Sequence, residues 1–149
     1  MKNYSRFGAM ILTSTVVMFF LMYLNIYSFD HAVFSESRTY MALIMGSVMA
    51  LIMLGFMLDM YKNRTANIAI AAGAVAIFAL SLWLVRSQET VEDISWMKAM
   101  IPHHSVAILT SERANITDPR VRKLADQIIE SQRREITEME NLIRELENK

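Results

Sequence analysis

Two adjacent histidines follow two methionines in the segment Trp96–His104, and these residue types and spacings suit metal chemistry. On an α-helix Met97, Met100 and His104 share one face, whereas His103 is turned from that face by about 100°. Thioether sulfur and neutral imidazole favour Cu(I) over Mg²⁺, Ca²⁺ or Mn²⁺. The same pattern also fits a partly buried helix in which methionine fills gaps and the histidines form hydrogen bonds.

A second helix, from Arg120 to about Glu147, is expected to supply further ligands. Its apolar seam reads Val121, Ala125, Ile128, Gln132, Glu135, Met139, Leu142 and Leu146, with Ile129, Ile136 and Ile143 beside it. Gln132 and Glu135 interrupt this seam, and burying such groups is unfavourable unless something binds them. An exposed edge of the seam is the alternative explanation.

The turn between the two helices sets which residues face one another. A turn near Ile116–Asp118 places His104, Met100 and Met97 level with about Glu130, Arg134 and Thr137 in an antiparallel hairpin. The seam residues nearest these heights are Gln132, Glu135 and Met139. Two sets noticed independently, Met97/Met100/His104 and Gln132/Glu135/Met139, are thus predicted to lie opposite each other. This coincidence favours the metal site over simple packing.

The ends of these helices carry recognisable signals. Thr90 to Asp93 resembles a capping box, which predicts a helix from Thr90 to about Asn115. Pro102 inside this helix removes one backbone hydrogen bond and predicts a kink beside the histidines. Asp118 followed by Pro119 predicts the N-cap and the first residue of the second helix.

The first part of the chain is apolar and predicts a membrane anchor. Hydrophobic residues make up 54% of the 149 residues, and most of the charge lies after residue 86. Three uncharged runs, Phe7–Tyr27, Tyr40–Leu58 and Ala66–Val85, are each close to the about 20 residues that cross a bilayer as a helix. The sequence therefore predicts an all-α protein with a three-helix membrane anchor over residues 1–86 and a helical hairpin over 87–149.

Loop charge predicts the orientation of these spans, because basic loops stay in the cytoplasm. The basic residues flanking the first span and between the second and third are Lys2, Arg6, Lys62 and Arg64. The loop from Ser28 to Thr39 carries only Arg38 against two acidic residues. We therefore expect a multi-pass cell (inner) membrane protein with a cytoplasmic N-terminus and an extracytoplasmic, periplasmic C-terminal domain.

Composition narrows the functional classes further. The chain has no cysteine, so it forms neither a disulfide nor a thiolate metal site. It also lacks a basic patch with interleaved aromatic residues, so nucleic-acid binding is not expected. Neither a Ser-His-Asp pattern nor a phosphate-binding loop is present, so catalysis is not expected. Methionine recurs at every fourth residue from Met41 to Met57. This stripe suits a path for Cu(I) or, alternatively, the filling of helix–helix gaps in lipid.

The soluble half resembles the domain of unknown function 305 family. The resemblance rests on Met-Ile-Pro-His-His at 100–104, Asp-Pro-x-Val-Arg-x-Leu-Ala at 118–125 and Gln-x-x-Glu-Ile-x-x-Met at 132–139. It implies half of a ferritin-like four-helix bundle with an extracytoplasmic copper site. By position, it implicates Met97, Met100, His103, His104, Gln132, Glu135 and Met139. Thr110-Ser111 stands where the family often has a second methionine-containing stretch.

The leading hypothesis is a membrane-anchored copper-binding protein that serves copper handling or tolerance, with Cu(I) favoured over Cu(II) and iron less favoured. A structural or interaction module without metal is the first alternative. A di-iron carboxylate oxidoreductase is the second, although no Glu-x-x-His pair occurs. The expected partners are the lipid bilayer, a second copy of the chain in a homo-oligomer, and other copper-handling proteins.

Overall fold

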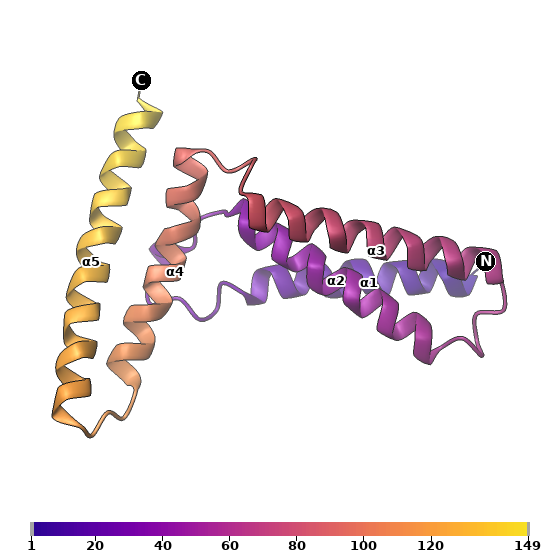
Figure 1. Ribbon diagram of the computed structural model, residues 1–149, viewed down its shortest axis with the longest axis horizontal. Helices are drawn as coiled ribbons and strands as arrows, with labels where there is room; N and C mark the ends of the chain where they lie inside the picture. The colour runs from indigo at the N-terminus through magenta and orange to yellow at the C-terminus, as the bar shows by residue number, and fades with distance from the viewer. Residues whose placement is uncertain (1, 149) are drawn as a thin grey trace. The chain divides into compact units, whose positions relative to one another are not determined.

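The computed structural model describes residues 2–148, and in that range every regular element is a helix (Figure 1). The elements are α1 (Lys2–Leu21), a short 3₁₀ helix η1 (Phe29–His31), α2 (Glu36–Phe56), α3 (Arg64–Ser87), α4 (Asp93–Arg113) and α5 (Pro119–Glu147). The all-α class is therefore confirmed for the described residues.

Three of these helices are long and apolar enough to cross a membrane, namely Asn3–Leu21 of α1, Glu36–Phe56 and Arg64–Ser87. Most of their side chains are not buried within the protein, as Leu12, Phe20 and Leu80 illustrate with well over half of each exposed. A helix that is apolar on all sides and unburied suits lipid as its surroundings.

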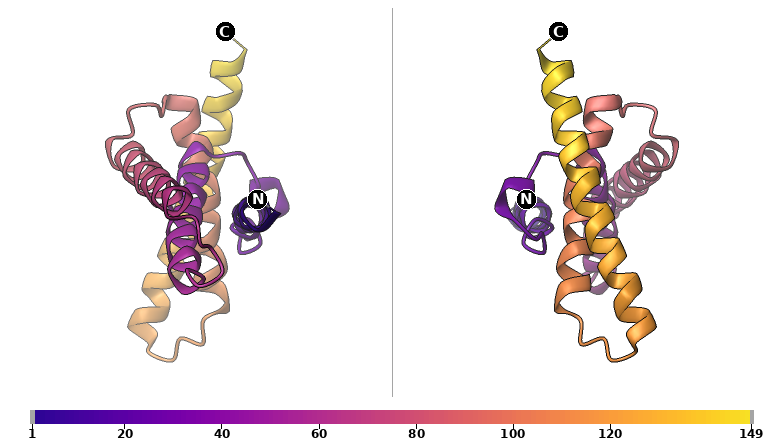
Figure 2. Two further views of the ribbon diagram at one scale, coloured as in Figure 1. Left: turned by 90° about the vertical axis from the view of Figure 1, so that its right-hand side faces the viewer. Right: turned by 90° about the vertical axis from the view of Figure 1, so that its left-hand side faces the viewer.

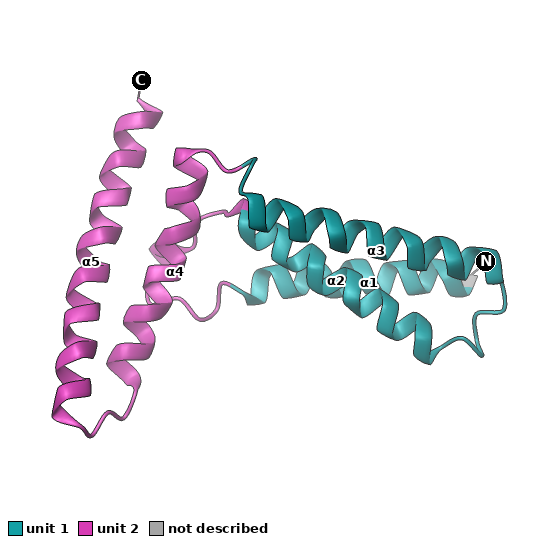
Figure 3. Cartoon of the chain, viewed as in Figure 1, with its two compact units in different colours: residues 1–22, 37–90 teal, residues 23–36, 91–149 magenta. Residues whose placement is uncertain are grey.

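The chain forms two compact units (Figure 3). Unit 1 comprises residues 1–22 and 37–90, and unit 2 comprises residues 23–36 and 91–149. Unit 2 thus contains α4 and α5 together with the segment between α1 and α2. We call this segment, residues 23–36, the strap.

The prediction that the first helix runs to Tyr27 is wrong, since α1 ends at Leu21. The residues that follow belong to unit 2: Ile26 is buried, and the Tyr27 backbone N–H donates to Ser105 Oγ at 2.7 Å. A backbone N–H held by a side chain of α4 cannot continue the i→i−4 hydrogen bonds of a helix.

Unit 1 is held by one buried cluster and a few polar contacts. Its buried cluster comprises Phe7, Ala50, Leu54, Tyr61 and Ala74. Asn63 caps the start of α3 by accepting a hydrogen bond from the Ala66 N–H at 3.0 Å. Tyr4 of α1 donates to the Asn67 side chain at 2.9 Å, which ties α1 to α3.

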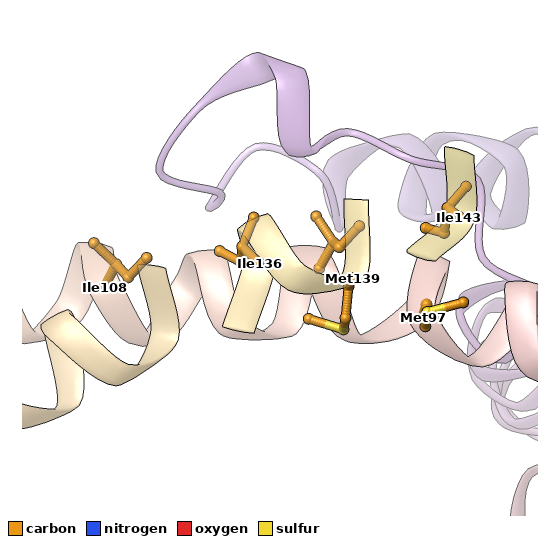
Figure 4. Packing of buried hydrophobic residues seen from close by; sticks show 6 residues of the cluster. Met97, Ile108, Ile136, Met139 and Ile143 are labelled. Atoms are coloured by element: carbon orange, nitrogen blue, oxygen red, sulfur yellow. The ribbon is translucent and has the colours of Figure 1, made fainter. Parts of the chain in front are cut away.

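In unit 2, α4 and α5 lie side by side and form an antiparallel hairpin (Figures 1 and 2). The hairpin core comprises Met97, Ile101, Ile108, Ile136, Met139 and Ile143 (Figure 4). Val33 of the strap packs against this core, so the strap is part of the folded unit.

The start of α4 differs from the prediction, whereas the start of α5 agrees with it. α4 begins at Asp93 after Glu92, and the Thr90 hydroxyl, which lies 2.8 Å from that of Tyr40, does not cap it. Asp118 caps α5 by accepting from the Arg120 N–H at 2.8 Å, and Pro119 is its first residue, as expected. The Arg120 guanidinium lowers the pKa of Asp118, which keeps this cap ionised at neutral pH. α4 continues through the buried Pro102.

The buried face of α5 coincides only in part with the predicted seam. Ala125 and Met139 of the seam are buried, together with Ile136 and Ile143, which were expected to flank it. Val121, Leu142 and Leu146 of the seam are 49%, 42% and 36% exposed, so they lie at one edge of the contact. Each step of one residue turns a helix by about 100°, so two apolar stripes this close compete for the same partner.

Candidate metal centre

His104 of α4 and Glu135 of α5 meet at mid-length of the hairpin. Nε2 of His104 lies 2.8 Å from Oε2 of Glu135, and the two side chains are 15% and 42% exposed. Nδ1 of His104 donates to the Met100 carbonyl oxygen at 2.8 Å. The two ring nitrogens thus face a carbonyl oxygen and a carboxylate oxygen.

The hydrogen bond at Nδ1 is of the kind that orients metal-binding histidines. A metal-binding histidine usually donates its other ring N–H to a carbonyl or carboxylate, which fixes the ring and its tautomer. Here the Met100 carbonyl fills that role and leaves Nε2 as the binding nitrogen. The Glu135 carboxylate lies next to Nε2, where it could be a second ligand of an ion bound by that nitrogen.

The pairing of His104 with Glu135 rather than Glu130 has a geometric cause. Side chains of an α-helix point toward its N-terminus. In an antiparallel hairpin this tilts the α4 side chains away from the turn and the α5 side chains toward it. A side chain of α4 therefore contacts a residue of α5 that lies further from the turn than the residue whose Cα is at the same height. The Lys98–Glu147 ion pair at 2.6 Å shows the same offset.

Three of the predicted methionines lie in or against the core of the same hairpin. Met97 and Met139 are buried in the core cluster, and Met100 packs against it. Figure 4 shows Met97 on α4 and Met139 on α5 among the packed isoleucines. The structure thus gathers the thioethers on the two helices that also supply His104 and Glu135.

His103 and Gln132 are less closely associated with this pair. His103 is exposed, and its ring centre lies 6.0 Å from that of His104 at a steep angle. Gln132 is half-buried on the face of α5 that turns toward α4. Within residues 2–148 of one chain, no three side chains of the His, Asp or Glu type gather closely enough to hold a metal ion.

Ser105 is an important residue that sequence reasoning missed. It is fully buried, and its Oγ accepts from the Tyr27 N–H at 2.7 Å and forms a 2.9 Å hydrogen bond with Nδ1 of His31. These bonds fasten the strap to α4 directly beside His104. The spacing of Ser105 from Ile101 and Ile108 is the signal that would have placed it on the buried face.

Arg133 fastens the strap to α5 on the same side of the hairpin. Its guanidinium donates to Tyr27 Oη at 3.0 Å and to Glu112 Oε1 at 2.6 Å, and it lies over the Tyr27 ring. The hydrogen bonds to Tyr27 and Glu112 raise the pKa of Arg133. A pocket of about 240 Å³ remains here, lined in part by His31, Arg133 and Glu140.

Fold and site together define an all-helical protein with three candidate membrane spans and a helical hairpin that gathers histidine, glutamate and methionine. A family model described as "Domain of unknown function (DUF305)" matches residues 83–149. The chain belongs to this family. It is also 36% identical over 110 residues to Uncharacterized protein L153 of Acanthamoeba polyphaga mimivirus, covering 68% of this chain and 72% of that protein. This likeness is longer than the family match and extends into the half of the chain that contains the candidate membrane spans. No solved structure matches the chain.

Proposed function

We propose that this protein binds copper at the hairpin, with His104, Met100 and Glu135 at the centre of the site and Met97, Met139, His103 and Gln132 around it. The observation that carries the proposal is the His104–Glu135 contact, in which Met100 orients the imidazole. Three methionines of the same hairpin supply thioether sulfur for a soft ion. Cu(I) therefore suits the donor set better than Cu(II) or iron.

The separation of the two central donors fits a shared ion. Bonds from a metal ion to nitrogen or oxygen are about 2.0–2.2 Å long, so neighbouring ligands lie roughly 3 Å apart. Nε2 and Oε2 lie 2.8 Å apart, so a small outward movement of the exposed Glu135 admits an ion. Imidazole binds a metal ion in its neutral form, so copper affinity should fall as the pH falls.

Substitution of the central ligands tests the copper site. In the full chain in detergent, His104→Ala and Met100→Leu should each weaken Cu(I) binding at least tenfold, measured by competition with a chromophoric Cu(I) chelator. Met100→Leu keeps the volume and the helix propensity while it removes the sulfur. Met41→Leu in α2 is the matched control and should bind as wild type. Unchanged affinity in both site variants contradicts the assignment.

We further propose that unit 2 faces the extracytoplasmic side and that the N-terminus is cytoplasmic. Basic residues flank α1 and lie between α2 and α3, on the side that the positive-inside rule assigns to the cytoplasm. The strap and residues 91–149 fold together in unit 2, so both must lie on the same side of the membrane. Three crossings satisfy this condition, because α2 and α3 cross the membrane and return between the two segments.

Reporter fusions test this topology. Fusions after Ser35 and after Lys149 should report the extracytoplasmic side, and a fusion after Asn63 should report the cytoplasm. A periplasmic phosphatase and a cytoplasmic fluorescent protein, each inserted at all three positions, give opposite readings and control for expression. A cytoplasmic signal after Lys149 overturns the topology and the extracytoplasmic location of the copper site.

A further inference from the structure

One long edge of the α4–α5 hairpin carries exposed apolar side chains near both of its ends. We call it the open edge and define it on α5 by Val121, Leu124, Leu142 and Leu146, and on α4 by Trp96. Leu124 and Trp96 are 55% and 50% exposed, and the other three are more than a third exposed. Trp96, Leu142 and Leu146 also line a groove of about 430 Å³.

The opposite edge of the hairpin is already covered within the chain. The strap is bonded there to Ser105 and Arg133, and Arg133 is paired with Glu112. Lys98 and Glu147 close the far end with their ion pair. The apolar open edge has no such cover in the part of the chain that the structure describes.

Glu135 lies on the open edge by helical spacing, since it is seven residues from Leu142. The His104–Glu135 pair therefore lies at the middle of this edge, because both residues lie near mid-length of their helices. Besides the Met100 thioether, one chain contributes only this pair at the centre, since no third His, Asp or Glu side chain joins it among residues 2–148. The candidate copper site therefore lies on an uncovered surface, where a second chain can add further ligands.

We propose that a second copy of this chain docks on the open edge across a two-fold axis, so that His104 and Glu135 of both copies together hold one copper ion. This inference rests on the proposed copper function. A two-fold contact places the same patch of both copies face to face. Because the pair lies at mid-length, an axis parallel or perpendicular to the helices brings the two pairs to the same height.

The size of the open edge fits such a contact. α5 has 29 residues, and at 1.5 Å per residue it is about 43 Å long. Two neighbouring helices of about 10 Å diameter give this side of the hairpin a footprint of roughly 800 Å². That is about the area that each partner buries in a stable protein–protein interface.

Charge beside the open edge favours an antiparallel arrangement of the two α5 helices. Beside the open edge, the exposed Arg120 lies near the start of α5, the exposed Arg134 near its middle, and the exposed Glu138 and Glu145 in its second half. Two antiparallel copies place the basic end of each helix opposite the acidic end of the other. A parallel arrangement sets like charges together and is less favourable.

Native mass spectrometry of the full chain in mild detergent with Cu(I) tests the shared site. Wild type should be a dimer that binds one copper ion per two chains. Leu142→Glu places a charge on the open edge and leaves the buried Ile143 unchanged, so it should give monomers whose copper affinity is at least tenfold weaker. Asn141→Glu adds the same charge at the neighbouring position on the outer face, and this control should stay dimeric.

Disulfide cross-linking locates the interface independently, because the chain contains no cysteine. Ser131→Cys lies beside the open edge near the middle of α5 and should cross-link two chains on oxidation. Thr137→Cys lies on the opposite face of α5 and should not. Both native hydroxyls bond only to a backbone carbonyl of the preceding turn, so the two variants disturb the helix equally.

The outcomes separate the shared site from the copper function itself. One copper ion per chain in a monomer, with no effect of Leu142→Glu, overturns the shared site and leaves copper binding intact. A dimer that cross-links through Ser131→Cys but binds no copper overturns the proposed function and the shared site with it. Equal cross-linking of Ser131→Cys and Thr137→Cys overturns the assignment of the interface to the open edge.

Discussion

Replacing Ser105 with leucine is expected to detach the strap from α4 and to destabilise unit 2 severely. Ser105 is fully buried, so the larger side chain must displace its neighbours, at about 1–3 kcal/mol. The Tyr27 N–H also loses its acceptor, and an unpaired buried donor adds about 1–3 kcal/mol. Hydrogen–deuterium exchange should show loss of protection throughout residues 23–36, together with a lower melting temperature.

Two further variants separate the volume effect at Ser105 from the hydrogen-bond effect. Ser105→Ala removes the hydroxyl without adding volume, so it should lose only the hydrogen-bond contribution of about 1–3 kcal/mol. Thr110→Leu is the matched control, because Thr110 is an exposed hydroxyl residue of the same helix and bonds only to carbonyls of the preceding turn. Wild-type protection of the strap in Ser105→Leu contradicts the role of this serine.

The loss of the strap should also affect copper binding, which links the fold to the proposed function. His104 follows Pro102 on α4 and precedes Ser105, so a change in how the strap holds α4 alters the position of the imidazole. The strap lies outside the residues that the family model matches, which begin at residue 83. A fragment of residues 87–149 therefore lacks a part of unit 2 that the intact chain uses.

Replacing Gly46 with leucine is expected to separate α1 from α2 and to lower the stability of unit 1. Gly46 is buried, and a Cβ added there collides with the side chain of Thr15 on α1. The Thr15 hydroxyl is itself bonded to the Ile11 carbonyl at 2.8 Å, so it cannot turn away without losing that bond. Overpacking of this kind reduces stability by about 1–3 kcal/mol or more.

Thermal unfolding in detergent measures the effect of Gly46→Leu, with Gly55→Leu as its control. Gly55 lies on the same helix, and nothing stands within 4 Å of a Cβ added there. The control should therefore unfold close to the wild-type temperature, whereas Gly46→Leu should unfold several degrees lower. Equal melting temperatures in the two variants would show that α1 and α2 do not approach closely at Gly46.

The sequence by itself determined the features that depend on local composition and spacing. Three long apolar runs specify helices long enough for a membrane, because only a helix satisfies the backbone in lipid within one segment. Asp118 and Pro119 set the start of α5, since a cap and a fixed φ act within a single turn. The motifs around His104 and Glu135 were sufficient to indicate the family.

Tertiary structure decided what depends on competition between distant segments. The helix does not continue through Tyr27, because Ser105, far along the chain, binds the Tyr27 N–H. Thr90 meets the Tyr40 hydroxyl and lies two residues before the N-cap position of α4, Glu92. In α5 two apolar stripes lie less than a quarter turn apart, and the sequence alone does not rank them. Packing against α4 buried Ile136 and left Leu142 exposed. The rotation of α5 about its own axis decides which stripe faces α4, and only the packing of the two helices sets that rotation.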